Sequence, residues 1–233
     1  YETSYTAEET TRINDEIKSF EEKYGLDINE RFMFGTQIHY HVKNEKDEIV
    51  VSSQSISDSE HNRSIRSRGS YLENIGHQTH VDSFEPGREN EQLTFVLDGV
   101  EKVVPADFSI EVNQAELKKQ PITADYEGST ITVKSIEKKV DYFFEKSLMP
   151  IKRQKYFEIK LEMTQAPNAP ELYNWAIIDD KGKAYEAYYS GSNIDLSLYI
   201  YDWDKIPENF TLQLLTKTVF EEVEDKWEVP LYK

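Results

Sequence analysis

Apolar and polar residues alternate with a period of two over much of this chain. The first clear case covers residues 32–42, where one face would carry Phe34, Thr36, Ile38, Tyr40 and Val42, and the other Gln37, His39 and His41. Successive side chains of a strand point to opposite faces, so this pattern predicts a half-buried strand. A polar turn at Asn44 to Asp47 leads to residues 48–53, which are expected to pair with it.

The region before residue 31 has a helical period instead. Thr6 and Glu9 have the spacing of a capping box, and Gly25 is a natural helix terminator. The apolar positions between them recur every three or four residues: Ile13, Ile17, Phe20 and Tyr24. We predict an amphipathic helix that lies on the surface of the first domain. The alternative is the end of a longer helix next to a membrane.

The remaining apolar runs are short and strand-like. They occupy residues 93–96, 108–112, 130–136, 140–145, 156–163, 172–178, 183–189, 196–201, 210–219 and 227–231, with a hairpin tip at Asp180 to Gly182. Short strands at this spacing predict a β-sandwich. Residues 54–92 are rich in Ser, Arg, Asn, Gly and His, so long polar loops are expected there. Short strands are the alternative around five apolar positions of this region: Tyr71, Leu72, Ile75, Val81 and Phe84. Asn113 to Gly128 contains Pro121 and several charges, and we expect residues 114–128 to link two domains.

The composition narrows the classes of function. The chain has 15 Tyr and 11 Phe in 233 residues, enough large side chains for a buried core. Its net charge of -17 argues against nucleic acid as a partner and against electrostatic docking on anionic membranes. The absence of cysteine excludes disulfides, thiolate metal sites and cysteine nucleophiles. No apolar run approaches the roughly 20 residues that span a bilayer. Any membrane attachment is expected through a segment upstream of Tyr1.

Several segments resemble a known group of proteins. They are "GSTITVKSIEKKVDYFFE", "YFEIKLEM", "WAIIDDKGKAYEA" and "FTLQLLTKTVFEEVEDKWEVPL" in residues 128–233, with "IHYHVKNEKDEIVVSS" in the first half. The chain resembles the extracytoplasmic region of Gram-positive membrane proteins related to anti-sigma factors. The resemblance implies a mainly β fold of two tandem β-sandwich, immunoglobulin-like domains with an N-terminal amphipathic helix. It places a helix plus β domain at 1–113 and an immunoglobulin-like sandwich at 129–233, and it supplies no catalytic residues.

Histidines and acidic residues are the candidate metal ligands. His39 and His41 would face the same way on their strand, so two imidazoles could grip one ion, completed by His61, His77 or His80. The competing interpretation places these histidines on the polar face of a strand, without metal. Acidic clusters at 179–180 and 221–225 lack the ligand spacing of calcium loops and are expected to be solvated. No metal or cofactor is therefore expected.

Aromatic and basic residues are the candidate binding groups. Trp203, Tyr201 and Tyr199 lie near a predicted loop, and Trp203 is expected to be exposed there. Trp175 and Trp227 are expected in the core. Arg63 and Arg66 fall in the polar region and could meet an acidic partner, although such a run is more often solvated.

The expected function is non-enzymatic, because the chain lacks nucleophile, phosphate-loop and metalloprotease motifs. We expect an extracytoplasmic sensing or interaction region of a membrane-anchored regulator, with a protein or cell-wall ligand. One alternative is a wall-associated adhesive or glycan-binding module. The other is a hydrolase that depends on a metal or on paired carboxylates.

Overall fold

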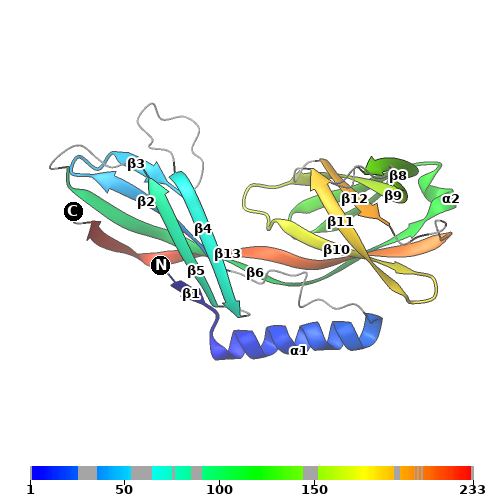
Figure 1. The fold of residues 1–233 in the computed structure, drawn as a ribbon, viewed down its shortest axis with the longest axis horizontal. Coiled ribbons are helices and arrows are strands. Elements are labelled where there is room, and N and C mark those ends of the chain that lie inside the picture. The colour runs from blue at the N-terminus through cyan, green and yellow to red at the C-terminus, as the bar shows by residue number, and fades with distance from the viewer. Residues whose placement is uncertain are drawn as a thin grey trace. The chain divides into compact units, whose positions relative to one another are not determined.

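The structure is a computed structural model, and it is mainly β with an N-terminal helix (Figure 1). It describes residues 2–25, 36–53, 65–74, 77–84, 91–143, 152–191, 195–201, 203, 205 and 207–231. These residues form one large antiparallel sheet and a smaller three-stranded sheet. The predicted fold class is therefore confirmed at the level of a mainly β protein with an N-terminal helix.

Helix α1 spans Ala7–Tyr24 and has the caps that the sequence predicts. The backbone N–H of Thr6 donates to Glu9 Oε2 at 2.8 Å, and the backbone N–H of Glu9 donates to Thr6 Oγ1 at 3.2 Å. These reciprocal bonds satisfy two donors that the first turn would otherwise leave open. Gly25 ends the helix with a φ of 68°, and its N–H donates to the Glu21 carbonyl. Ile13 and Ile17 on the apolar face are buried.

Ten strands form the large sheet, in the order β3-β2-β6-β13-β10-β11-β12-β9-β8-β7. Their bounds are β2 Thr36–Asn44, β3 Ile49–Ser52, β6 Leu93–Asn113, β7 Ile122–Tyr126, β8 Ser129–Phe143, β9 Lys152–Gln165, β10 Leu172–Asp179, β11 Ala184–Gly191, β12 Asp195–Ile200 and β13 Asn209–Leu231. The small sheet has the order β1-β5-β4, with β1 at Glu2–Ser4, β5 at His77–Phe84 and β4 at Ile65–Asn74. Every pairing with a described register is antiparallel.

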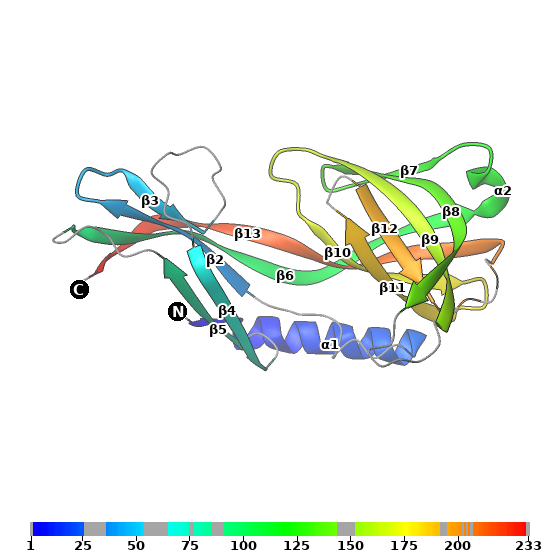
Figure 2. The same cartoon turned by 45° about the horizontal axis from the view of Figure 1, so that its top comes forward.

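The chain separates into two compact units that are not consecutive in sequence. Unit 1 comprises the described residues within Tyr1–Asn14, Met33–Val104 and Val219–Lys233, and unit 2 those within Asp15–Phe32 and Pro105–Thr218. The long strands β6 and β13, neighbours in the sheet, each contribute residues to both units (Figures 1 and 2). This division does not follow the predicted bounds of 1–113 and 129–233, because each unit takes residues from both ranges. Each long strand reads in the sequence as two short apolar runs, so the sequence pattern assigns its two ends to different elements.

The residues predicted to link two domains form regular secondary structure. Residues 114–128 contain helix α2 (Gln114–Leu117) and strand β7, and all of them lie within unit 2. Asn113 caps α2 by accepting a hydrogen bond from the Glu116 N–H at 3.0 Å, and Leu117 is buried. Within residues 54–92, where long loops were expected with short strands as the alternative, β4 and β5 form an antiparallel pair.

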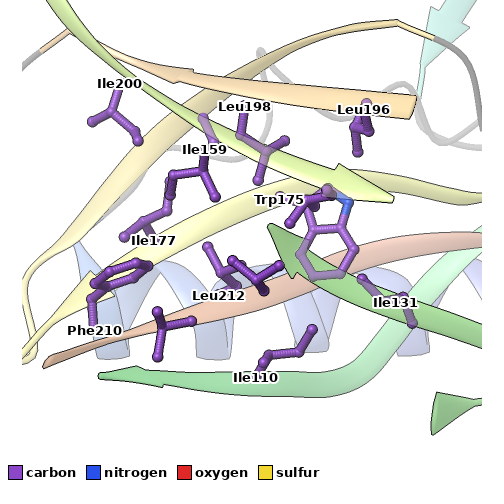
Figure 3. Close-up of a cluster of buried hydrophobic side chains, with 14 of the residues drawn as sticks. Ile110, Ile131, Ile159, Trp175, Ile177, Leu196, Leu198, Ile200, Phe210 and Leu212 are labelled. Atoms are coloured by element: carbon purple, nitrogen blue, oxygen red, sulfur yellow. The ribbon is translucent and has the colours of Figure 1, made fainter. Parts of the chain in front are cut away.

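Unit 2 contains a large hydrophobic core. Alternate residues of β6, β8, β9, β10, β12 and β13 converge on it, as Figure 3 shows for Ile110, Ile131, Ile159, Trp175, Ile177, Leu198, Ile200 and Leu212. A flat sheet could not bring these strands around one cluster, so the sheet curves around its own inner face. The outer face of β9, β11 and β12 is consequently left to polar and amphipathic side chains.

Unit 1 has a smaller core, built mainly from β2 and β3. Burial alternates along β2 from Thr36 to Val42, which confirms the predicted half-buried strand. Two hydrogen bonds join β2 to β5 of the small sheet. Tyr40 Oη donates to Asp82 Oδ2 at 2.7 Å, and His80 Nε2 lies 2.7 Å from the Thr36 carbonyl oxygen. Since a carbonyl only accepts, His80 carries its proton on Nε2.

Candidate functional site: a tyrosine surface on the outer face of unit 2

Four tyrosines from neighbouring strands of unit 2 lie on the outer face of the sheet. Tyr156 belongs to β9, Tyr188 to β11, Tyr199 to β12, and Tyr201 follows β12 directly. We call these four residues the tyrosine surface. Their sequence neighbours Phe157, Ala187, Leu198 and Ile200 are buried in the core, so the alternation of the strands turns the tyrosines outward. Tyr188 is 51% exposed, and the other three are half-buried.

The strand register brings the four rings together. Tyr188 is the direct partner of Tyr199 across β11 and β12. Ring centroids lie 5.5 Å apart for Tyr156 and Tyr199, 5.6 Å for Tyr156 and Tyr201, and 5.6 Å for Tyr188 and Tyr201. The planes meet at 45° to 70°, which is the tilted or edge-to-face packing that aromatic quadrupoles prefer. The cluster therefore presents tilted ring faces and edges rather than one flat platform.

A carboxylate lies beside these rings. Glu158 is the direct partner of Tyr199 across β12 and β9, and its side chain is only 13% exposed. Its Oε1 accepts a hydrogen bond from Ser197 Oγ at 3.0 Å. Its Oε2 lies 3.6 Å from Lys139 Nζ, which is too long for a hydrogen bond of ordinary strength. Glu158 thus places a mostly buried negative charge at the border of the tyrosine surface.

Lys139 is shared between two carboxylates. It is the strand partner of Tyr156, and its Nζ lies 2.6 Å from Glu137 Oε2 as well as 3.6 Å from Glu158. The hydrogen bond to Glu137 is the main cause that raises the pKa of Lys139, and the same bond lowers the pKa of Glu137. Lys139 is therefore charged at neutral pH, and its closer contact is with Glu137.

The two tryptophan predictions at the ends of β12 and β13 are wrong, whereas Trp175 is in the core as predicted. Trp203 was expected to be exposed, but it is 6% exposed, and its ring contacts those of Phe157, Tyr185 and Phe210. The chain bends after β12, so the strand period no longer sets which way Trp203 points. Trp227 was expected in the core, but it is 59% exposed. Its ring contacts that of Phe95, which packs against the core of unit 1.

Each of the two paired histidines has its own carboxylate neighbour. His39 Nε2 lies 3.2 Å from Glu101 Oε2, and its ring is 4.9 Å from that of Phe220. His41 Nδ1 lies 2.9 Å from Asp98 Oδ1. Within the described ranges, no three His, Asp or Glu side chains are grouped closely enough to hold a metal ion. The geometry thus places His39 and His41 in two separate polar pairs, and His61 lies outside the described residues.

The remaining candidate groups are the arginines of the polar region and the acidic residues of the predicted hairpin. Arg66 lies in β4, and Arg63 lies outside the described residues. Asp179 shapes the predicted hairpin, because its Oδ1 accepts hydrogen bonds from the N–H groups of Lys181 and Lys183, both at 2.9 Å. Desolvation alone would raise the pKa of Asp179, but these hydrogen bonds outweigh it and lower the pKa. Asp179 is therefore accounted for as a turn residue.

Part of the tyrosine surface could be predicted from the sequence. Tyr199 and Tyr201 were candidate binding residues, and strand alternation turns one of Tyr188 and Tyr189 outward, whereas Tyr156 was not a candidate. The signal for Tyr156 was the clean alternation of Phe157, Ile159 and Leu161, which puts position 156 on the opposite face. The register that joins β9 to β12 is a tertiary property, so the meeting of these rings was beyond the sequence pattern.

The comparisons with known proteins identify no relative: no family model, curated protein or solved structure matches the chain. Among the helices that the structure describes, none has the length and apolar character needed to cross a membrane.

Proposed function

We propose that this chain is a non-enzymatic sensing or interaction region that works outside the cytoplasm as part of a membrane-anchored regulator. It contacts a protein or cell-wall ligand through the tyrosine surface. The observation that carries this proposal is that four tyrosines, three in neighbouring strands and one directly after β12, lie together on the outer face of unit 2. Tyrosine provides a large contact area at little cost in conformational entropy, and it is enriched where proteins bind ligands.

The location outside the cytoplasm and the anchored state rest on the resemblance to anti-sigma-factor-like proteins. We further infer that unit 2 is a sandwich of the immunoglobulin-like type, which would suit a rigid extracellular support. Antiparallel strands that enclose one core support this inference, since such sandwiches present ligands with outward-facing strands and loops.

The location is tested by protease treatment of intact cells that express the complete gene product with its native start. We expect a membrane-associated protein whose tyrosine-bearing unit is digested from outside. Full protection in intact cells, with digestion only after lysis, would refute the location.

The surface is tested separately, in the native host. Tyr188→Ser combined with Tyr201→Ser should reproduce the transcript changes caused by deleting the coding region. The matched control is Val81→Ser, which removes an apolar side chain of similar exposure (53%) from unit 1. Thermal unfolding of the purified variants checks that both remain folded. Wild-type transcript levels in the folded double variant would show that the tyrosine surface does not carry the function.

A wall-associated glycan-binding role is the second candidate, favoured by the same half-exposed rings. It would require a sugar to stack on a tyrosine face. Binding of a neutral oligosaccharide, with loss on substitution of Tyr188, is the observation that would select it.

A further inference from the structure

We propose that the tyrosine surface binds a cationic group, carried by a lysine- or arginine-rich segment of a protein partner. This inference rests on the proposed function and specifies the ligand class of that same surface. The feature that points to it is the combination of tilted aromatic faces with the mostly buried carboxylate of Glu158. Aromatic rings attract cations through the negative potential of their faces, and a nearby carboxylate adds to that attraction.

The arrangement of the residues fits this ligand. One row across β11, β12, β9 and β8 reads Tyr188, Tyr199, Glu158 and Glu137, each the direct register partner of the next. The carboxylates therefore continue the aromatic row instead of lying at a distance from it. The net charge of -17 adds a long-range field that draws basic partners toward the protein and repels polyanions.

Lys139 already occupies part of the position that a ligand cation would take. Its contact with Glu158 is long at 3.6 Å, whereas its contact with Glu137 is 2.6 Å. A ligand cation that approaches from the tyrosine side can therefore take over Glu158 while Lys139 keeps Glu137. It follows that Lys139 competes with the ligand, and removing its charge should tighten binding.

The strand pair provides a matched control for this substitution. Lys134 on β8 forms an ion pair with Glu162 on β9, in the same pair of strands. Lys134→Gln changes the net charge by the same amount as Lys139→Gln, but the carboxylate that loses its lysine is Glu162. The strand partners of Glu162 are Asp195 and Thr132, which are not part of the tyrosine surface. Glu162→Gln is the corresponding control for Glu158→Gln.

The experiment titrates the full chain with three probes, followed by NMR of the tyrosine ring signals and by calorimetry. The probes are a capped octapeptide of alternating glycine and lysine, the same peptide with glutamate in place of lysine, and a neutral hexasaccharide of N-acetylglucosamine. We expect only the lysine peptide to bind and to shift the tyrosine signals. Raising the salt from 50 to 500 mM should weaken this binding.

The variants then decide the mechanism. Lys139→Gln should tighten binding of the lysine peptide by roughly two- to five-fold, the range of a partly exposed ion pair, while Lys134→Gln leaves it near the wild-type value. Tyr188→Leu should weaken it by roughly two- to five-fold, because leucine keeps the apolar area and loses the ring face. Glu158→Gln should weaken it more than Glu162→Gln does.

Three results would overturn the inference. Binding of the hexasaccharide at the tyrosine signals, without binding of the lysine peptide, would refute the cationic ligand and leave the proposed function standing. Equal effects of Lys139→Gln and Lys134→Gln would show that the peptide responds only to net charge. Peptide binding unchanged by Tyr188→Leu would show that it binds elsewhere.

Discussion

Replacing Gly99 with alanine tests the close approach of β6 and β13 in unit 1. A Cβ atom built on Gly99 would lie 2.3 Å from Phe220 Cζ, 2.5 Å from Phe220 Cε2 and 2.7 Å from the Glu221 carbonyl oxygen. All three distances are well below ordinary van der Waals contact. The substitution therefore requires both a side chain and the backbone of β13 to move.

The two obstacles differ in how easily they yield. The Phe220 ring is 45% exposed and can turn outward, at the loss of its contact with His39. The Glu221 carbonyl belongs to the backbone of the neighbouring strand, so it moves only if the strands separate. Overpacking of this kind lowers the free energy of unfolding by about 1 to 3 kcal/mol, and replacing glycine in a strand by alanine raises it by about 0.5 to 1 kcal/mol. We expect Gly99→Ala to lower the free energy of unfolding by about 1 to 2 kcal/mol.

Urea unfolding followed by circular dichroism measures this change, and a double-mutant cycle separates the two obstacles. In a Phe220→Ala background the ring contact is gone, and we expect Gly99→Ala to cost about half as much because the carbonyl remains. Gly25→Ala is the control for conformational strain without crowding: its φ is 68°, and nothing lies within 4 Å of the added atom. A neutral or stabilising Gly99→Ala would refute the close approach of these strands.

Two further predictions concern charge and burial. Hydrogen bonds from Lys102 and from the Thr6 backbone lower the pKa of Glu9 to about 2. The ionised Glu9 side chain therefore contributes fully to stability above the ordinary pKa of 4.5, and this contribution is lost as the pH falls toward 2. Glu9→Gln should cost about 1 to 2 kcal/mol at neutral pH, allowing for solvent screening, and urea unfolding should show the difference from wild type vanishing near pH 2; a difference independent of pH would contradict this. In the same assay, Trp203→Ala should lower the free energy of unfolding by about 3 to 5 kcal/mol and Trp227→Ala by less than about 1 kcal/mol. The reverse order would contradict the burial of Trp203 and the exposure of Trp227 in the structure.

Local chemistry was the part of the fold that could be predicted. The capping box of Thr6 and Glu9 and the terminator Gly25 define α1 without help from the rest of the chain. The hairpin at Asp179 to Gly182 is similarly local, closed by a bond from the Gly182 N–H to the Asp179 carbonyl at 3.0 Å. Each of these features depends only on residues within four positions of one another.

The tyrosine surface was predictable only in part, for a geometric reason. Alternation along β12 turns Tyr199 away from its buried neighbours Leu198 and Ile200, and the pattern of β9 carries the same information for Tyr156. Whether those two rings meet depends on the pairing of β12 with β9, which are separated along the chain by β10 and β11. A period of two contains no information about the register between distant strands.

The sequence by itself determined a mainly β chain with one capped N-terminal helix and a strongly acidic surface, because caps, turns and alternation act over a few residues. Tertiary structure alone decided that β6 and β13 each continue between two separate apolar runs and contribute to two units. It also decided that Trp203 is buried and Trp227 exposed. The physical reason is that a strand is held by hydrogen bonds to its neighbours, so its length and the environment of its side chains depend on which strands lie beside it.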